Sequence, residues 1–397
     1  MSRTNPTDGQ QTVRERLREA SRTTADAREK ESVLEQFVEP KRNTSDYTGD
    51  TRRHSDVDSL RRHFGLAPWD ADAFDYPSVI PNFLAKTWNP GSDETAGGTD
   101  VLAVGKPGSG KSTLADYLAV RDVEINNSMH VWRGSTSRSE WLALAPWVTL
   151  ALPAGVDVTA RLESKVPTEP TIVLDVDDLE RIVREVVRYR DPLELNRELL
   201  EPGQIHVVYP DPKMRGAQAI YEESDEKQYE APSGRDDLFS PNDPAGHWWF
   251  AWVLARVEHG PHNWTTLTLD EIGDIAPQSA QKDQFGTYQK VELLKDVWVD
   301  ARKFGLTIHA FGHSEVDIHQ MIRHKKRWRI QMPGMANPTS ASDCVGFRSV
   351  PMNTDITSDL PVGQALMFTE TNFEKFAWSD MPTPHNYKLQ IKVGGSA

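Results

Sequence analysis

The sequence predicts an α/β fold in which a mainly parallel sheet is flanked by helices. Short apolar runs alternate along the chain with longer helix-like stretches, a pattern typical of parallel strands joined by crossover connections. A glycine-rich segment stands between the first apolar run and the helix-like stretch behind it, which indicates a tight strand-to-helix turn. The chain has 397 residues, of which 38% are hydrophobic, so it is long enough to bury a sizeable core.

Residues 1–72 are predicted to form a polar arm, helical or partly disordered, ahead of an α/β domain over residues 73–397. The arm has mixed charge and few large apolar side chains. Within it, the apolar residues suggest an amphipathic helix, and they are Val13, Leu17, Val33, Leu34, Phe37 and Val38. Such a helix is either a solvated extension or a segment that docks on a partner or on the chain itself.

The α/β domain contains a series of apolar runs that we interpret as strands. The strand candidates are residues 101–104, 129–132, 148–152, 171–174, 205–209, 265–269 and 307–311. The helix candidates are residues 112–120, 177–189, 248–258 and 288–303. Residues 211–245 are rich in charged residues, glycine and proline, so we expect them to leave the sheet as a long excursion.

The charge balance and the single cysteine limit the classes of function. Acidic residues exceed basic ones by 59 to 45, which gives a formal net charge of -14. A nucleic acid would therefore have to meet a local basic patch rather than the average field of the surface. Cys344 excludes an intramolecular disulfide and a cysteine-rich metal site, and it favours a reducing compartment. The N-terminus has no apolar core typical of a signal peptide, so we expect a cytoplasmic protein without a transmembrane segment.

Residues 105–112, Gly-Lys-Pro-Gly-Ser-Gly-Lys-Ser, match the Walker A pattern of a phosphate-binding loop. Glycines let backbone N–H groups point at the β- and γ-phosphates of Mg-ATP, at the positive end of the following helix. Lys111 would bridge these phosphates, Ser112 would coordinate Mg²⁺, and Thr113 would lie near the α-phosphate. The alternative is a glycine-rich turn without a ligand. The predicted nucleotide-binding residues are Gly105, Lys106, Pro107, Gly108, Ser109, Gly110, Lys111, Ser112 and Thr113.

The strand candidate at residues 265–269 ends in a pair of acids, in the manner of a Walker B motif. Strand alternation would direct Asp270 toward the metal and leave Glu271 beside the γ-phosphate. There Glu271 could orient and polarise the attacking water as a general base. An acid pair at a strand end is also a common capping feature. The acids after residues 171–174 are the runner-up metal ligands, and they are Asp175, Asp177 and Asp178.

A third block, residues 297–314, is read as a helix ending in Ala-Arg-Lys-Phe-Gly and then a strand that closes on His-Ser. With the phosphate loop and the acid pair before it, this order resembles the HerA/FtsK superfamily of ring-forming, DNA-pumping ATPases. Residues 360–368 look like the "pGxal" strand that follows in that family. The resemblance implies a P-loop NTPase with a RecA-like sheet that hydrolyses ATP to ADP and phosphate. It also implies a homo-oligomeric ring, a hexamer in this family.

The resemblance implies two further catalytic roles. The family normally has glutamine as the polar sensor at the end of the later strand, whereas this chain has His313. A neutral imidazole can still donate to the γ-phosphate or to the water, but it adds pH dependence. Alternatively, His313 is a buried strand-end histidine. In such rings an arginine from the neighbouring subunit stabilises the charge on the transferring phosphoryl group. Arg302 is the first candidate for this arginine and Arg329 the second.

The most basic segment of this acidic chain is residues 322–329. It could contact a nucleic-acid backbone through charge and stacking, or it could face an acidic neighbouring subunit. The candidates for nucleic-acid binding are Arg323, Lys325, Lys326, Arg327 and Trp328.

The acidic composition, the excess of arginine over lysine, and the segments Trp132-Arg133-Gly134 and Ser139-Glu140-Trp141 resemble those of ATPases encoded by haloarchaeal viruses and plasmids. That resemblance implies translocation or packaging of double-stranded DNA, as in viral genome packaging or DNA transfer. It also implies virion or capsid proteins as partners, in the host cytoplasm or with the virion. The main rival is a Zot-like assembly or morphogenesis ATPase that acts on protein or membrane without nucleic acid. A third hypothesis is a nucleotide-binding structural virion protein.

Overall fold

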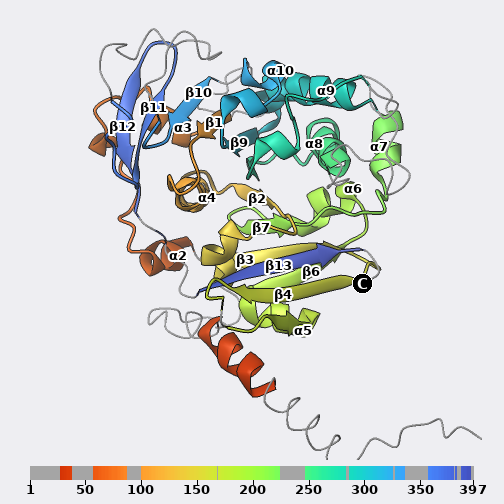
Figure 1. The fold of residues 1–397 in the computed structure, drawn as a ribbon. Helices are drawn as coiled ribbons and strands as arrows, with labels where there is room; N and C mark the ends of the chain where they lie inside the picture. The colour runs from red at the N-terminus through yellow and green to blue at the C-terminus, as the bar shows by residue number, and fades with distance from the viewer. Residues whose placement is uncertain are drawn as a thin grey trace, which may run out of the picture.

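The computed structural model describes ten stretches of the chain. They are residues 27–37, 57–86, 100–167, 169–223, 246–282, 286–324, 327–335, 356–379, 381 and 386–394. In Figure 1 a large sheet with its helices occupies the upper part of the molecule, and a smaller sheet lies at its lower end.

The main sheet confirms the predicted α/β fold. Over the described residues it has ten strands in the order β12-β11-β10-β1-β9-β8-β2-β7-β3-β6. From β10 to β6 each neighbouring pair is parallel, whereas β11 and β12 add an antiparallel hairpin at one edge. The strands are β1 (Asp100–Val104), β2 (Met129–Arg133), β3 (Val148–Pro153), β6 (Glu185–Tyr189), β7 (Ile205–Val208), β8 (Thr265–Leu269), β9 (Leu306–Gly312), β10 (Trp328–Gln331), β11 (Gln364–Phe368) and β12 (Phe373–Ala377).

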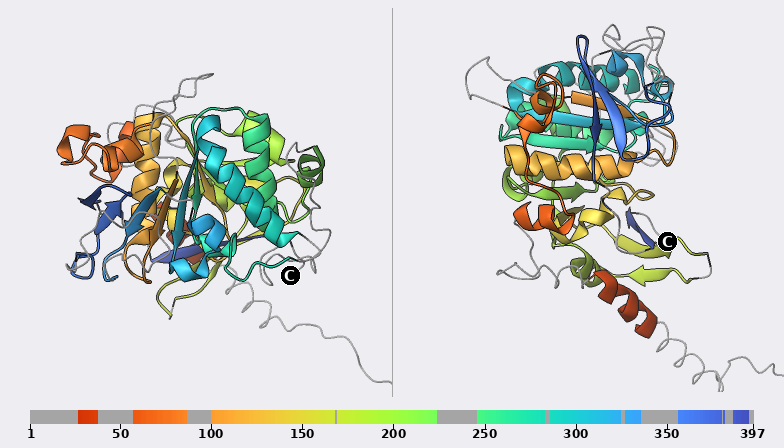
Figure 2. Two further views of the ribbon diagram at one scale, coloured as in Figure 1. Left: turned by 90° about the horizontal axis from the view of Figure 1, so that it is seen from above. Right: turned by 90° about the vertical axis from the view of Figure 1, so that its left-hand side faces the viewer.

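Helices cover both faces of the main sheet. One face is covered by α4 (Lys111–Asn126), and the other by α8 (Gly246–His259) and α9 (Thr287–Asp300), as the left view of Figure 2 shows. Alternate residues of β1 belong to the two core clusters: Val101 packs with the α4 side and Leu102 with the α8 side. Because both of its faces are buried, β1 appears in the sequence as a continuous apolar run.

Shorter helical elements join these main ones. They are α2 (Val57–His63), η1 (Ala71–Ala73), α3 (Ile80–Leu84), η2 (Glu140–Trp147), α5 (Val176–Ile182), α6 (Pro192–Glu194), η3 (Leu195–Leu199), α7 (Ala217–Glu223), η4 (Ile272–Asp274), η5 (Ala301–Phe304), η6 (Glu315–Asp317) and α10 (Gln320–Arg323).

A smaller antiparallel sheet lies next to α5, on which the first described helix of the arm docks. Its order is β13 (Tyr387–Val393), β4 (Val158–Ser164) and β5 (Ile172–Leu174). The helix over residues 27–37 docks beside α5, where Glu31 accepts hydrogen bonds from Arg181 and Lys30 pairs with Asp178. Its apolar side chains are buried in the core cluster that also contains α4. The sequence left open a solvated extension, a segment that docks on a partner and one that docks on the chain itself. The helix over residues 27–37 docks on the chain itself.

One predicted element is wrong, and a second lies in a different sheet from the one expected. The helix expected over residues 177–189 ends at Ile182, and β6 begins three residues later. Valine-rich residues 183–187 suit a pleated, half-buried strand, and β3 supplies a parallel partner along its whole length. The candidate at residues 171–174 is a strand, but β5 pairs in the small antiparallel sheet and not in the main one. Within the predicted excursion the structure describes α7, and residues 224–245 lie outside the described residues.

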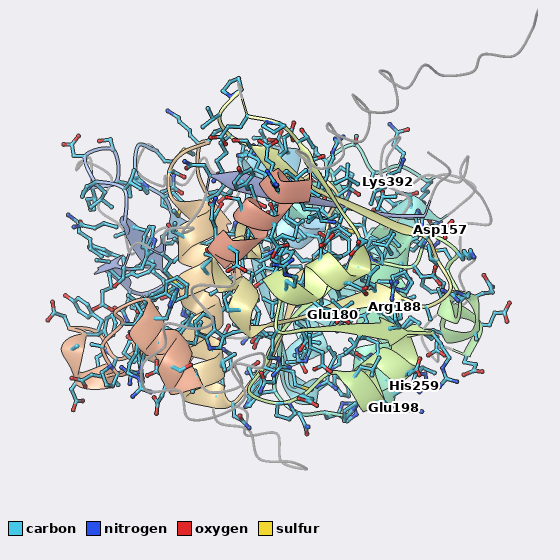
Figure 3. All side chains as sticks on the ribbon, turned by 90° about the horizontal axis from the view of Figure 1, so that it is seen from below. Asp157, Glu180, Arg188, Glu198, His259 and Lys392 are labelled. Atoms are coloured by element: carbon cyan, nitrogen blue, oxygen red, sulfur yellow. The ribbon has the colours of Figure 1, made fainter. Side chains whose placement is uncertain are left out.

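The surface is charged, as the composition predicts. Seen from below, Figure 3 shows Asp157, Glu180 and Arg188 with exposed side chains on this face. Among the described residues, no helix combines the length and apolar character required to span a bilayer.

Candidate functional site

The phosphate loop, residues 105–112, forms the turn from β1 into α4. Gly108 and Gly110 have φ angles of 80° and 89°, in the left-handed region that favours glycine. Gly105 is needed for a different reason, because a Cβ atom there would lie 2.4 Å from Met332 Cβ. The loop therefore ends on the N-terminus of a 16-residue helix, where backbone N–H groups and the helix dipole attract anions.

Lys111 is folded back over this loop. Its Nζ donates to the carbonyl oxygens of Gly105 at 2.6 Å and Lys106 at 3.1 Å, and it lies 3.2 Å from His313 Nδ1. Burial lowers the pKa of Lys111, and the carboxylates of Glu271 and Asp270 oppose that shift. The ammonium group is thus positioned by backbone acceptors that an anionic ligand can replace.

The order of the strands brings the acid pair to the phosphate loop. Strand β9 lies between β1 and β8, and all of these strands are parallel, so their carboxyl ends meet at one edge. Around a cavity of about 590 Å³ this edge gathers Pro107, Gly108, Gly110, Lys111, Ser112, Thr113, Asp270, Glu271 and His313. Of the other predicted loop residues, Gly105 and Lys106 hold Lys111, and Ser109 lies buried within the turn.

Glu271 has a backbone conformation that only a constrained site supports. Its φ of 68° is left-handed, which is uncommon and costly for a residue with a side chain. Its Oε2 lies 3.4 Å from His313 Nε2 and 4.0 Å from Arg138 Nη1. Burial raises the pKa of Glu271, whereas the neighbouring His313 and Arg138 act in the opposite direction. His313 therefore joins the general-base candidate to Lys111 and is not a buried strand-end histidine, because 46% of its side chain is exposed.

The residues present fit a magnesium ion. Ser112 supplies a hydroxyl and Asp270 a carboxylate to the same cavity, and these are oxygen ligands of the kind Mg²⁺ prefers. Asp270 Oδ2 is buried, and no N–H or hydroxyl group of the described residues donates to it. A buried carboxylate oxygen of this kind needs a partner, and a bound cation would provide one.

Two further carboxyl groups, which the sequence did not predict as site residues, stand beside Asp270. Glu140 from η2 also lines the cavity, and burial together with the charge of Asp270 raises the pKa of Glu140 to about 7. Asp116 lies one turn after Ser112 on α4, and burial, then Glu140 and Asp270, raise its pKa well above the usual range. Mutual repulsion among Asp270, Glu140 and Asp116 therefore opposes the ionisation of all of these carboxyl groups together.

Glu140→Gln should stabilise the metal-free chain in a pH-dependent way. The folded pKa of about 7 exceeds the ordinary 4.5, so this carboxyl's contribution to stability is fully present below 4.5 and is lost as pH rises through about 7. Glutamine cannot ionise, so we expect a gain of up to about 3 kcal/mol at pH of about 8 and none near pH 4.5. Denaturant unfolding at both pH values measures the change in the free energy of unfolding. The control is Glu198→Gln at an exposed position, which should change this free energy at neither pH. An equal gain at both pH values would contradict it.

An apolar part of the cavity wall comes from the C-terminal part of the chain. It is formed by Val362, Gly363 and Trp378. Trp378 Nε1 donates to Thr113 Oγ1 at 3.0 Å, and a Cβ atom on Gly110 would lie 3.1 Å from its ring. The sequence signalled this wall only through the "pGxal" resemblance at residues 360–368. The cavity thus combines charged side chains with an apolar wall that lies against Gly110 and Thr113 of the phosphate loop.

The runner-up acids do not belong to this site. Asp175 and Asp178 form the capping box of α5, in which each side chain accepts from the other's backbone N–H. Lys30 of the arm helix pairs with both carboxylates. Asp177 lies in the first turn of the same helix. The structure therefore gives these acids a structural role and does not support them as metal ligands.

The two arginine candidates lie in different surroundings. Arg302 is on η5, before β9, and His313 follows the other end of this strand. Seven extended residues span about 23 Å, so Arg302 cannot reach the cavity of its own chain. Arg329 is 2% exposed, and it donates to Glu315 Oε1 at 3.1 Å and to the carbonyl oxygen of Arg323. Arg329 is therefore a buried structural residue of β10, and its prediction as the arginine that acts on a neighbouring subunit's nucleotide is wrong.

The prediction that the basic segment, residues 322–329, binds nucleic acid is wrong for part of its residues. Trp328 is 7% exposed in β10 and packs near Phe83, so it offers no free face for a nucleobase. Arg323 is equally buried and donates to the carbonyl oxygen of Glu315. Arg327 is more exposed and lies 4.0 Å from Asp100. Lys325 and Lys326 lie outside the described residues.

Comparison with known proteins gives likenesses of structure alone. No family model matches the sequence, and no curated protein matches it. The genome packaging NTPase B204 from Sulfolobus turreted icosahedral virus 2, in complex with ATP-gammaS, is 12% identical over 71% of this chain and 98% of that chain, with a TM-score of 0.35. The pCW3 conjugation coupling protein TcpA is 12% identical over 79% of this chain and 70% of that chain, with a TM-score of 0.34. The N-terminal domain of zonular occludens toxin from Neisseria meningitidis is 10% identical over 74% of this chain and 92% of that chain, with a TM-score of 0.24. Identities and TM-scores this low assign no function to this chain.

Proposed function

We propose that this chain is a Mg²⁺-dependent ATPase that hydrolyses ATP to ADP and phosphate. The observation that carries the proposal is one cavity that combines the phosphate loop, Lys111, the Asp270–Glu271 pair and His313. Each group has the chemistry that phosphoryl transfer to water requires, and the strand order explains why they meet.

The polarity of the cavity supports one orientation of the nucleotide. The triphosphate would lie along the phosphate loop toward Lys111 and Glu271, because N–H groups and an ammonium ion favour anions. The base and sugar would lie toward Val362 and Trp378, because that wall offers apolar surface.

Hydrolysis then follows from the roles of the side chains. Glu271 accepts a proton from the attacking water while the water oxygen bonds to the γ-phosphorus. The bond from the γ-phosphorus to the β–γ bridging oxygen breaks, and ADP and phosphate leave. Lys111 stabilises the negative charge on the phosphates, and His313 donates to the terminal phosphate or the water. Ser112 and Asp270 would hold Mg²⁺, which when bound neutralises phosphate charge and orients the leaving group.

We further propose that turnover drives movement or packaging of double-stranded DNA by a homo-oligomeric ring, in a host cytoplasm or on a virion. The order of the motifs supports this setting, since it resembles that of HerA/FtsK motors. Duplex DNA should then raise the rate of phosphate release several-fold in high-salt buffer. Single-turnover controls without DNA establish the basal rate, and a rate that does not change with DNA would contradict the motor.

One observation favours an assembly ATPase of the Zot-like kind instead. Within the described part of the basic segment, Arg323 and Trp328 are buried, so the surface expected to meet nucleic acid is reduced. Turnover that is indifferent to DNA but rises with a virion or capsid protein would support this second candidate. Tight ATP binding without turnover would instead support a structural nucleotide-binding protein.

A further inference from the structure

Arg138 is a cation in the cavity that none of the sequence motifs included. It follows β2, in a tight turn closed by a bridge between Ser135 and Arg138. Its guanidinium lies 4.0 Å from Glu271 Oε2 and 3.8 Å from Asp274 Oδ2. Both distances exceed that of a direct hydrogen bond, so charge attraction orients the side chain without saturating its donors.

The turn that carries Arg138 is fixed at both ends. A Cβ atom on Gly134 would lie 2.6 Å from the Tyr209 ring, so the chain passes directly against that side chain. Tyr209 also donates from its hydroxyl to the carbonyl oxygen of Ser135, at 3.3 Å. On the other side, Ser139 Oγ accepts a hydrogen bond from the backbone N–H of Leu389, at 3.0 Å. Arg138 is therefore presented to the cavity by a braced turn.

The neighbouring Arg133 shows what a purely structural arginine looks like at this site. It is 2% exposed, and it donates to the carbonyl oxygen of Asp270 at 3.0 Å and to Asp274 Oδ2 at 3.0 Å. Its N–H donors thus hold the chain in place where it leaves β8. Arg138 is 28% exposed, faces the cavity and has no such backbone acceptor among the described residues.

We infer that Arg138 is the arginine that each subunit supplies to the terminal phosphate of its own bound ATP. Lys111, His313, Glu271 and Arg138 form a continuous series of contacts across the cavity, so a phosphate beside Lys111 and Glu271 lies within reach of this guanidinium. The fork of N–H donors suits phosphate oxygens and stabilises the charge that develops on them during transfer. Before ATP binds, Glu271 and Asp274 hold Arg138 in place. The inference rests on the proposed ATPase function.

Arg138→Ala should lower kcat by on the order of 10²- to 10³-fold, with affinity for ATP-gammaS changed by less than about threefold. The variant should also fail to trap ADP with aluminium fluoride, an analogue of the transferring phosphoryl group. Arg138→Lys keeps the charge but not the fork, so it should recover only a small part of kcat. Arg190→Ala, at the far edge of the sheet beside β6, is the matched control and should behave as wild type.

Mixing subunits tests whether Arg138 acts within its own chain. Mixtures of Arg138→Ala and Lys111→Ala chains should stay inactive, because each subunit lacks either the nucleotide or the arginine beside it. Recovery in that mixture would overturn the inference, as would full trapping by Arg138→Ala or full kcat in Arg138→Lys. If wild type and Arg190→Ala both fail to release phosphate, the proposed function itself fails and the inference with it. If both turn over and Arg138→Ala does too, only the inference fails.

Discussion

Glu271→Gln should bind ATP with near wild-type affinity and release phosphate at least about 10³-fold more slowly. Glutamine keeps the size of the side chain and can still contact His313, but it cannot accept a proton from water. The strained backbone at this position, with φ of 68°, is compatible with a side chain placed for chemistry rather than for stability. Steady-state phosphate release and equilibrium binding of ATP-gammaS measure the two effects separately.

The control for this prediction is Glu198→Gln, an exposed glutamate on η3, which should leave both quantities unchanged. Normal turnover in Glu271→Gln would remove the general base from the account. Loss of nucleotide binding in this variant would instead indicate that Glu271 shapes the cavity and has no part in proton transfer.

Lys111→Ala should weaken binding itself. The ammonium group stands over the phosphate loop, held by the carbonyl oxygens of Gly105 and Lys106, and its charge is the main one that the loop offers to the β- and γ-phosphates. We expect affinity for ATP to fall by on the order of 10²-fold or more. Isothermal titration calorimetry with ATP-gammaS in the presence of Mg²⁺ measures this loss of affinity.

Lys392→Ala, on the exposed face of β13, is the matched control and should bind as wild type. A thermal melt of each variant establishes that the loop variant is folded. Wild-type affinity in a folded Lys111→Ala chain would mean that ATP does not bind along the phosphate loop.

Features carried by local sequence were predictable. Strand β1 is apolar on both faces, and Gly108 and Gly110 stand where the backbone must turn with positive φ. The Walker A pattern depends on these neighbouring residues alone, so its position at the start of α4 could be read directly from the sequence. That Asp270 lies beside this loop also depends on the parallel order of β1, β9 and β8. The order of the motifs in the sequence indicated that arrangement.

Features set by tertiary contacts were not predictable from the sequence. Glu140 and Arg138 follow β2 outside any motif with a predicted catalytic role, and they reach the cavity only because β2 is the neighbour of β8. Trp378 comes from after the hairpin of β11 and β12, whose antiparallel return no local pattern specifies. The basic segment was wrongly predicted to be an exposed binding surface throughout. Its charge in the sequence does not reveal that Arg329 is buried against Glu315.

The decisive measurement is a structure of the Glu271→Gln chain with bound Mg-ATP. We expect the triphosphate to lie along residues 105–112, with its γ-phosphate between Lys111 and the substituted side chain and its base beside Trp378. A nucleotide bound elsewhere, or bound with its phosphates away from the end of β8, would contradict it.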